Sequence, residues 1–110
     1  MLDVLQERPK MKPKSMSKIF GLWRYDTDKS ELIASDAYHD GNNWERGGTN
    51  TFLFRTPTGR YLMQYLTTRP DETDFIQPLY LDDALTLWFE LDKKYVEFEV
   101  AFPKVEIKDA

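Results

Sequence analysis

The chain has 110 residues, a formal net charge of −4 and no cysteine. This length predicts a single domain. The absence of cysteine excludes disulfide bonds, thiolate catalysis and cysteine-based zinc sites, and it favours a reducing, cytoplasmic compartment. No apolar run approaches the roughly 20 residues that a membrane-spanning helix needs, so no membrane partner is expected.

The charged residues are distributed unevenly along the chain. Residues 1–18 contain five basic and two acidic side chains, whereas residues 71–110 contain eleven acidic and four basic ones. Two prolines among the first lysines predict a flexible basic arm over residues 1–17, followed by one α+β domain over residues 18–110. Such an arm is typical of a tail that contacts another molecule or folds back on its own domain, but solubility alone explains it equally well.

Four strands are predicted ahead of the C-terminal third. Residues 18–26 and 31–38 are read as strands around a polar turn, and we expect them to pair as a hairpin. Residues 51–68 form a second hairpin, because Pro57 and Gly59 separate two runs of aromatic and β-branched residues and glycine tolerates a positive φ. The two hairpins together predict a four-stranded antiparallel β-meander with one covered, ring-rich face.

A C-terminal helix is predicted over residues 81–91. Its apolar residues recur at positions i, i+3, i+4 and i+7, namely Leu81, Ala84, Leu85 and Trp88. We expect this stripe to pack on the ring-rich face of the sheet, with Trp88 in the core. Residues 75–76 form a short extended link before the helix, and residues 95–102 fit either a strand or a helix.

The region between the two hairpins is a long predicted loop. Residues 39–50 are rich in glycine, asparagine and charged residues, and a loop of this length is often functional. Trp44 either folds back on the core or contacts a partner, because tryptophan and arginine are frequent at binding hot spots. The acidic turn near residues 71–74 is a second candidate contact. The predicted partner-binding residues are Tyr38, Asp40, Asn43, Trp44, Glu45, Arg46, Asp71, Glu72 and Asp74.

No catalytic constellation can be assembled from the sequence. His39 is the single histidine, so a multi-histidine metal site is excluded. Asp36, Asp40 and Glu45 could act as catalytic carboxylates, but their spacing in a loop does not determine their separation in space. We therefore expect a protein that is not an enzyme, with no catalytic residue, no metal and no cofactor. A small hydrolase is the least favoured class.

Nucleic-acid binding is the second functional class that the residue pattern supports. Rings alternate with arginines on the predicted sheet, in Arg24, Arg55, Arg60, Tyr61 and Tyr65, and such side chains can stack on bases. The remainder of the chain is acidic, so attraction to phosphate would come mainly from the lysines of the arm. Most rings in a small sheet are core residues, which is the opposing interpretation.

Two motifs in the domain resemble a family of small bacterial and phage proteins carried by mobile elements. Residues 25–33, YDTDKSELI, are similar to the family's opening hairpin, YDT-x-x-x-E-L-I. Residues 55–61, RTPTGRY, are similar to its second hairpin, RTP-x-GRY. Ser30 and Tyr80 depart from the family pattern, which has an alanine and a serine helix cap at these positions.

This resemblance covers residues 18–110 and implies an accessory protein of a phage or plasmid. The family is largely uncharacterised, and some of its members are expected to inhibit host defence, including as anti-CRISPR proteins. The resemblance supplies no catalytic residues, and it favours a short helix over residues 97–102.

The leading functional expectation is a non-enzymatic binding protein of a phage or mobile element. It would inhibit a host defence nuclease complex in the manner of an anti-CRISPR protein, through protein–protein contact. The expected partner is a host protein or ribonucleoprotein complex, such as a CRISPR effector or another nuclease. The alternative is a small nucleic-acid-binding module that uses the basic arm and the aromatic residues of the sheet.

Overall fold

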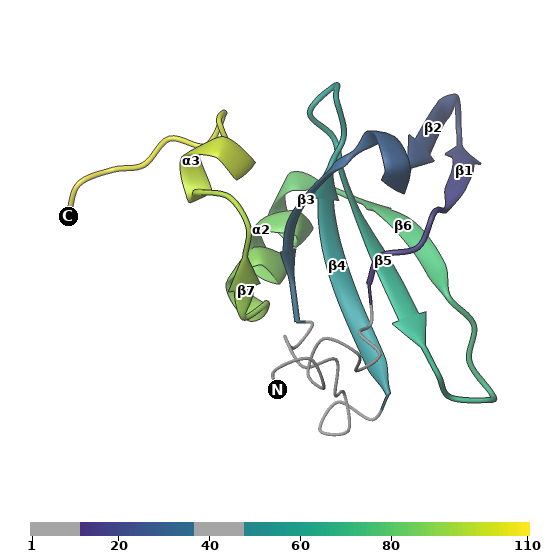
Figure 1. Ribbon diagram of the computed structural model, residues 1–110. Coiled ribbons are helices and arrows are strands. Elements are labelled where there is room, and N and C mark those ends of the chain that lie inside the picture. The colour runs from purple at the N-terminus through teal and green to yellow at the C-terminus, as the bar shows by residue number, and fades with distance from the viewer. Residues whose placement is uncertain (1–11, 37–47) are drawn as a thin grey trace, which may run out of the picture.

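A five-stranded antiparallel sheet is the centre of the computed structural model, which describes residues 12–36 and 48–110 (Figure 1). Its strands lie in the order β6-β5-β4-β3-β7. Their bounds are β3 (Glu31–Ser35), β4 (Thr49–Arg55), β5 (Tyr61–Thr67), β6 (Phe75–Leu79) and β7 (Lys93–Lys94). The predicted antiparallel α+β class is confirmed, but the predicted number of four strands is wrong.

A separate two-stranded ribbon precedes this sheet. It consists of β1 (Ser17–Phe20) and β2 (Trp23–Asp26), and the short helix η1 (Thr27–Lys29) connects it to β3. The single strand predicted over residues 18–26 is therefore wrong, and so is its pairing with the next strand. Gly21 adopts a φ of 65°, so the chain reverses there and Phe20 pairs with Trp23.

The central hairpin of β4 and β5 is confirmed. Phe54 lies opposite Leu62 across the two strands. In the turn, the backbone N–H of Gly59 donates to the carbonyl of Thr56 at 2.9 Å, and Gly59 has a φ of 85°. The positive φ that the sequence predicts for this glycine is thus present.

Strand β6 extends the sheet where the sequence predicts only a short link. It pairs with β5 over five positions, including Pro78 opposite Leu62. Proline lacks the backbone N–H, and it is tolerated here because β6 is at the edge of the sheet. Pro78 is thus incompatible with a strand in the centre of the sheet but compatible with an edge strand.

The helix predicted over residues 81–91 is confirmed as α2 (Leu81–Glu90), and Trp88 is buried as predicted. On its face of the sheet, one core cluster combines Ile33, Leu53, Tyr61, Ala84, Trp88, Leu91, Ala101 and Phe102. A short helix, α3 (Phe98–Ala101), closes this cluster. Residues 95–102 therefore contain a helix rather than a strand, in agreement with the resemblance.

The aromatic rings of the sheet are divided between its two faces. Phe52 and Phe54 belong to a second cluster on the face away from α2, together with Leu62, Leu66 and Ile76. Side chains that pair across β4 and β5 share a face, so Phe54 lies with Leu62, whereas Leu53 lies with Met63. The single ring-rich face that the sequence predicts is thus wrong.

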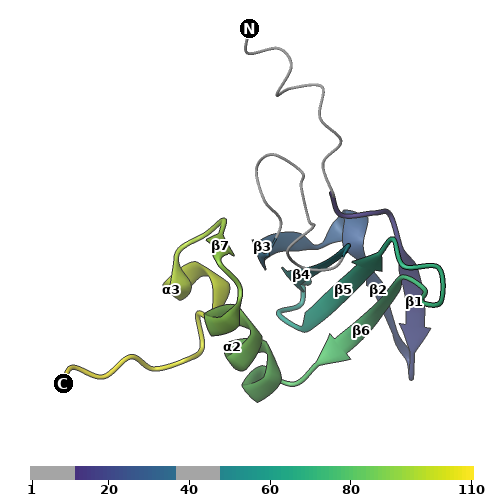
Figure 2. The same cartoon turned by 90° about the horizontal axis from the view of Figure 1, so that it is seen from below.

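In Figure 2, β5 lies between α2 and the β1–β2 ribbon.

The described end of the predicted arm lies against this second face. Met16 packs against the second cluster, and the backbone N–H of Lys14 donates to Gln64 Oε1 at 3.1 Å. Residues 1–11 lie outside the described part of the chain, so the extent of the arm stays a prediction. Every helix within residues 12–36 and 48–110 is too short or too polar to cross a membrane.

Candidate binding surface

The predicted contact residues fall into two groups. Tyr38, Asp40, Asn43, Trp44, Glu45 and Arg46 lie outside the described residues, so their role stays a prediction. Asp71, Glu72 and Asp74 lie in the turn between β5 and β6, and their role in partner binding also stays a prediction.

Two of these acidic residues stabilise the turn itself. The backbone N–H of Thr67 donates to Asp74 Oδ1 at 2.8 Å, and Lys14 Nζ lies 2.5 Å from Asp74 Oδ2. Glu72 accepts hydrogen bonds from the Thr67 hydroxyl at 2.9 Å and the Tyr65 hydroxyl at 3.1 Å. The hydrogen bond from Lys14 holds the pKa of Asp74 below its usual value, and the one from Thr67 does the same for the pKa of Glu72.

These lowered pKa values predict an acid-dependent loss of stability. A carboxyl group whose pKa is lower when folded stabilises the protein above its unfolded pKa, about 4, and this contribution disappears as pH falls through the folded pKa. The double variant Glu72→Gln/Asp74→Asn should be less stable than wild type at pH 7, and the difference should shrink towards zero near pH 2. Urea unfolding across this pH range measures the difference. An unchanged difference at every pH would show that these carboxylates do not titrate with folding.

The first candidate contact is the exposed apolar tip of the β1–β2 ribbon, formed by Leu22 in the turn and Ile19 on the face opposite Phe20 and Trp23. The Leu22 side chain is 98% exposed, and about half of the Ile19 side chain is exposed. On the inner side of the ribbon, Phe20 and Tyr25 pack edge to face, with ring centroids 5.7 Å apart. The inner rings anchor the ribbon, whereas the tip contributes little to burial within this chain.

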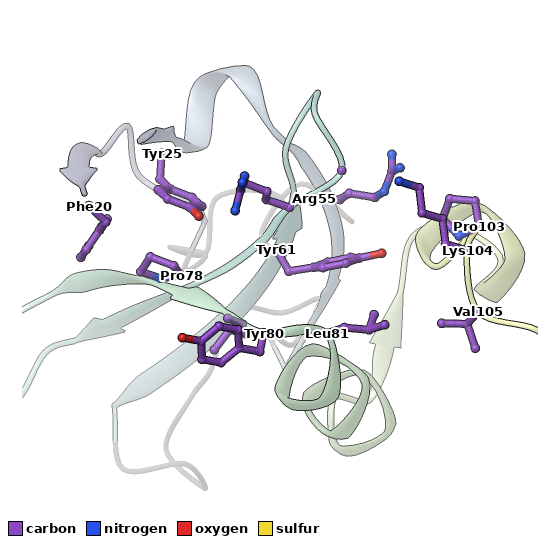
Figure 3. Close-up of a pocket in the computed structure, with 13 residues that line it drawn as sticks. Phe20, Tyr25, Arg55, Tyr61, Pro78, Tyr80, Leu81, Pro103, Lys104 and Val105 are labelled. Atoms are coloured by element: carbon purple, nitrogen blue, oxygen red, sulfur yellow. The ribbon is translucent and has the colours of Figure 1, made fainter. Parts of the chain in front are cut away.

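A groove of about 530 Å³ lies beside the ribbon. Figure 3 shows Phe20 and Tyr25 on one side of it, Tyr61 across the middle and Lys104 on the other side. Tyr80, just ahead of α2, also borders the groove. Four separate parts of the chain therefore build this site: the ribbon, the β4–β5 hairpin, the segment from the end of β6 into α2, and the segment after α3.

The groove is cationic. Arg55, Arg60 and Lys104 line it, and no carboxylate is among the described residues that do so. The Nε atom of Arg55 is buried and has no hydrogen-bond partner within the described part of the chain. Burial raises the pKa of the Tyr61 hydroxyl, and the Arg55 guanidinium partly opposes this rise. The Tyr61 hydroxyl donates to the carbonyl of Ala101 at 2.6 Å.

A smaller hollow of about 240 Å³, here called the side hollow, adjoins the groove. It shares Tyr25 and Arg60 with the groove, and its lining includes Trp23, Arg24 and Lys29. The Arg60 guanidinium carbon lies over the Trp23 ring, 3.7 Å from its centroid, in cation–π geometry. The one carboxylate in its lining, Asp26, accepts a hydrogen bond from the backbone N–H of Asp28 at 2.9 Å.

The structure gathers part of the basic and aromatic set that the sequence singles out. Arg55, Arg60 and Tyr61 line the groove, and Arg24 lines the side hollow. Tyr65 is not with them, because it stacks on Phe75 at a centroid distance of 5.3 Å. Sequence reasoning missed the contributions of Phe20, Tyr80 and Lys104, which no local pattern connects to the hairpin turn.

No group of three or more potential metal ligands occurs among residues 12–36 and 48–110. No protein-family model, no curated protein and no solved structure significantly matches the chain.

Proposed function

We propose that this protein is a non-enzymatic inhibitor that binds a host nuclease complex by surface contact. The observation that carries the proposal is the apolar tip of the β1–β2 ribbon, with Leu22 98% exposed. Ile19 and Leu22 are exposed apolar side chains at one end of the ribbon, and such a pair is more typical of an interaction site than a single exposed residue is. Leucine and isoleucine lose water when they are covered, which supplies the driving force for binding.

The geometry of the ribbon is suited to such a contact. Its two strands pair with each other and lie outside the main sheet, so the tip can enter a partner surface without opening the core. Basic side chains, Lys18 and Arg24, lie on the same ribbon. A partner with an apolar recess bordered by negative charge complements this tip.

The resemblance to mobile-element proteins supports the identity of the partner. It favours a CRISPR effector or another defence nuclease, which the inhibitor would meet in the host cytoplasm. Inhibition by occupation of a partner surface requires no chemistry on the inhibitor.

The test measures nuclease inhibition with purified components. We expect the wild-type protein to inhibit target cleavage by at least one complex in a panel of purified CRISPR effectors and other defence nucleases. Leu22→Asp should raise the half-inhibitory concentration about 30-fold, the effect of losing a hot-spot contact of about 2 kcal/mol. The substitution is on a fully exposed side chain, so the melting temperature should not change.

Ile107→Asp is the matched control. Ile107 is also an exposed apolar residue, but it lies in the C-terminal segment after α3. This variant should inhibit as well as wild type. Equal inhibition by Leu22→Asp and wild type, or no inhibition of any complex in the panel, would contradict the proposal.

A further inference from the structure

The charge of the groove is opposite to that of the protein. The chain carries a net charge of −4, yet Arg55, Arg60 and Lys104 line the groove and no described carboxylate does. A cleft lined by one sign of charge raises the local concentration of ligands of the opposite charge. The positive lining of this groove therefore favours a negatively charged ligand. The groove is therefore complementary to an anion.

Arg55 indicates the kind of anion. Its Nε is buried without a hydrogen-bond partner among the described residues, and its guanidinium lies against Gly59. A Cβ atom on residue 59 would lie 3.3 Å from the Arg55 guanidinium, so the glycine leaves room for this arginine. The buried Nε is not accessible to a ligand, but the planar guanidinium matches the oxygens of a phosphate or a carboxylate.

The rings distinguish between these two anions. Phe20, Tyr25, Tyr61 and Tyr80 line the groove together with the cations. Tyr25 and Tyr61 are buried, whereas the Tyr80 side chain is 85% exposed and is accessible to a base. An acidic peptide presents carboxylates without an aromatic ring on each unit. A nucleotide presents a phosphate and a flat base, and bases stack on exposed aromatic rings.

The side hollow provides a second site of the same kind next to the groove. It adjoins the groove through Tyr25 and Arg60, and it again combines a ring, Trp23, with basic residues. Two adjoining sites with the same pairing of cation and ring fit successive units of one chain. In a duplex the bases are already stacked on each other, so they could not reach these rings.

We propose that the groove and the side hollow bind single-stranded nucleic acid, with phosphates at Arg55, Arg60 and Lys104 and bases on the exposed rings. This inference does not rest on the inhibitory function, because its residues are distinct from Leu22. It also assigns the attraction for phosphate to the folded domain rather than to the basic arm.

The test is fluorescence anisotropy of the full-length protein with labelled single-stranded DNA and RNA 12-mers over a salt series. We expect the affinity to fall with increasing salt, with a slope that loses about 0.7 for each phosphate contact removed. Lys104→Glu should weaken binding about tenfold and reduce this slope. Tyr80→Ala should weaken binding about tenfold with the slope unchanged, because stacking does not release counterions.

Matched variants separate the groove from the remaining basic residues. Lys108→Glu makes the same charge change four residues away, outside the groove, and should leave the affinity within about twofold of wild type. Arg8→Gln/Lys10→Gln tests the arm in the full chain. Leu22→Asp should bind the oligonucleotides like wild type, so this result is independent of nuclease inhibition.

Three results would overturn the inference. The first is tight single-strand binding that falls with the arm variant but not with Lys104→Glu or Tyr80→Ala. The second is equal affinity for a duplex of the same sequence. The third is binding of labelled polyglutamate in place of the oligonucleotides, which would identify an acidic-peptide site.

Discussion

Replacing Phe102 with alanine is expected to lower the free energy of unfolding by about 3–5 kcal/mol, the range for deleting a buried phenylalanine ring. The side chain is 1% exposed and belongs to the cluster between the sheet and α2. Its ring stacks on Tyr61 at a centroid distance of 5.0 Å and meets Trp88 edge to face at 5.6 Å. The alanine would leave a cavity at the junction of three elements.

Urea unfolding of the purified variants measures this effect, with Phe89→Ala as the control. Phe89 is 71% exposed on α2 and contacts Phe98 at a centroid distance of 6.0 Å. We expect this control to lose less than about 1 kcal/mol. A similarly small loss for Phe102→Ala would show that the segment after α3 is not packed on the sheet, and the groove wall that contains Lys104 would then be in doubt.

The second large effect is expected for Gln64→Leu, which should lower the free energy of unfolding by about 2 kcal/mol. Gln64 is fully buried on β5. Its Oε1 accepts from the Lys14 backbone N–H at 3.1 Å, and its Nε2 donates to the Lys14 carbonyl at 2.9 Å. Leucine has nearly the same size but removes both hydrogen bonds. The Lys14 backbone N–H then loses its partner, whereas the Lys14 carbonyl keeps the hydrogen bond from the Thr27 hydroxyl at 2.7 Å.

Limited trypsin digestion gives a local measurement of the same change. Cleavage after Lys14 should be faster in Gln64→Leu than in wild type, because the released segment can enter the protease site. Gln77→Leu is the control, since Gln77 is exposed on the edge strand β6. Equal cleavage rates in all three proteins would mean that the amide of Gln64 does not hold the N-terminal segment.

The elements that could be predicted from the sequence are those with local causes. The apolar stripe of α2 repeats within the helix itself, and the β4–β5 turn is specified by Pro57 and Gly59. The burial of Trp88 followed from its place on that stripe. Periodicity and turn chemistry act over a few residues, so they are visible without knowing what the element packs against.

The errors concern pairing between distant segments. The alternation over residues 18–26 does not distinguish one strand from two, and only the reversal at Gly21 decides the matter. Strand β6 was missed because its Pro78 is acceptable only at a sheet edge, and edges are defined by the whole sheet. The division of the rings between two faces depends on the register of β4 with β5.

The candidate surface depends both on local sequence and on contacts between distant segments. The motif of residues 55–61 already places Arg55, Arg60 and Tyr61 at one turn, because they are close in the chain. Their conversion into a groove requires the ribbon, Tyr80 and Lys104, which approach only when the sheet and α3 have assembled. For Glu72 and Asp74, the sequence predicts exposed contact residues. The structure shows that both carboxylates accept hydrogen bonds from Thr67, at the start of the same turn.

For this protein, the sequence by itself determined the α+β class, the helix α2, the central hairpin and the separation of basic from acidic regions. The tertiary structure alone decided the strand order, the two-sided core and the cationic groove. The physical reason is that local conformation depends on neighbouring residues, whereas a cleft depends on which distant segments bury their apolar faces together.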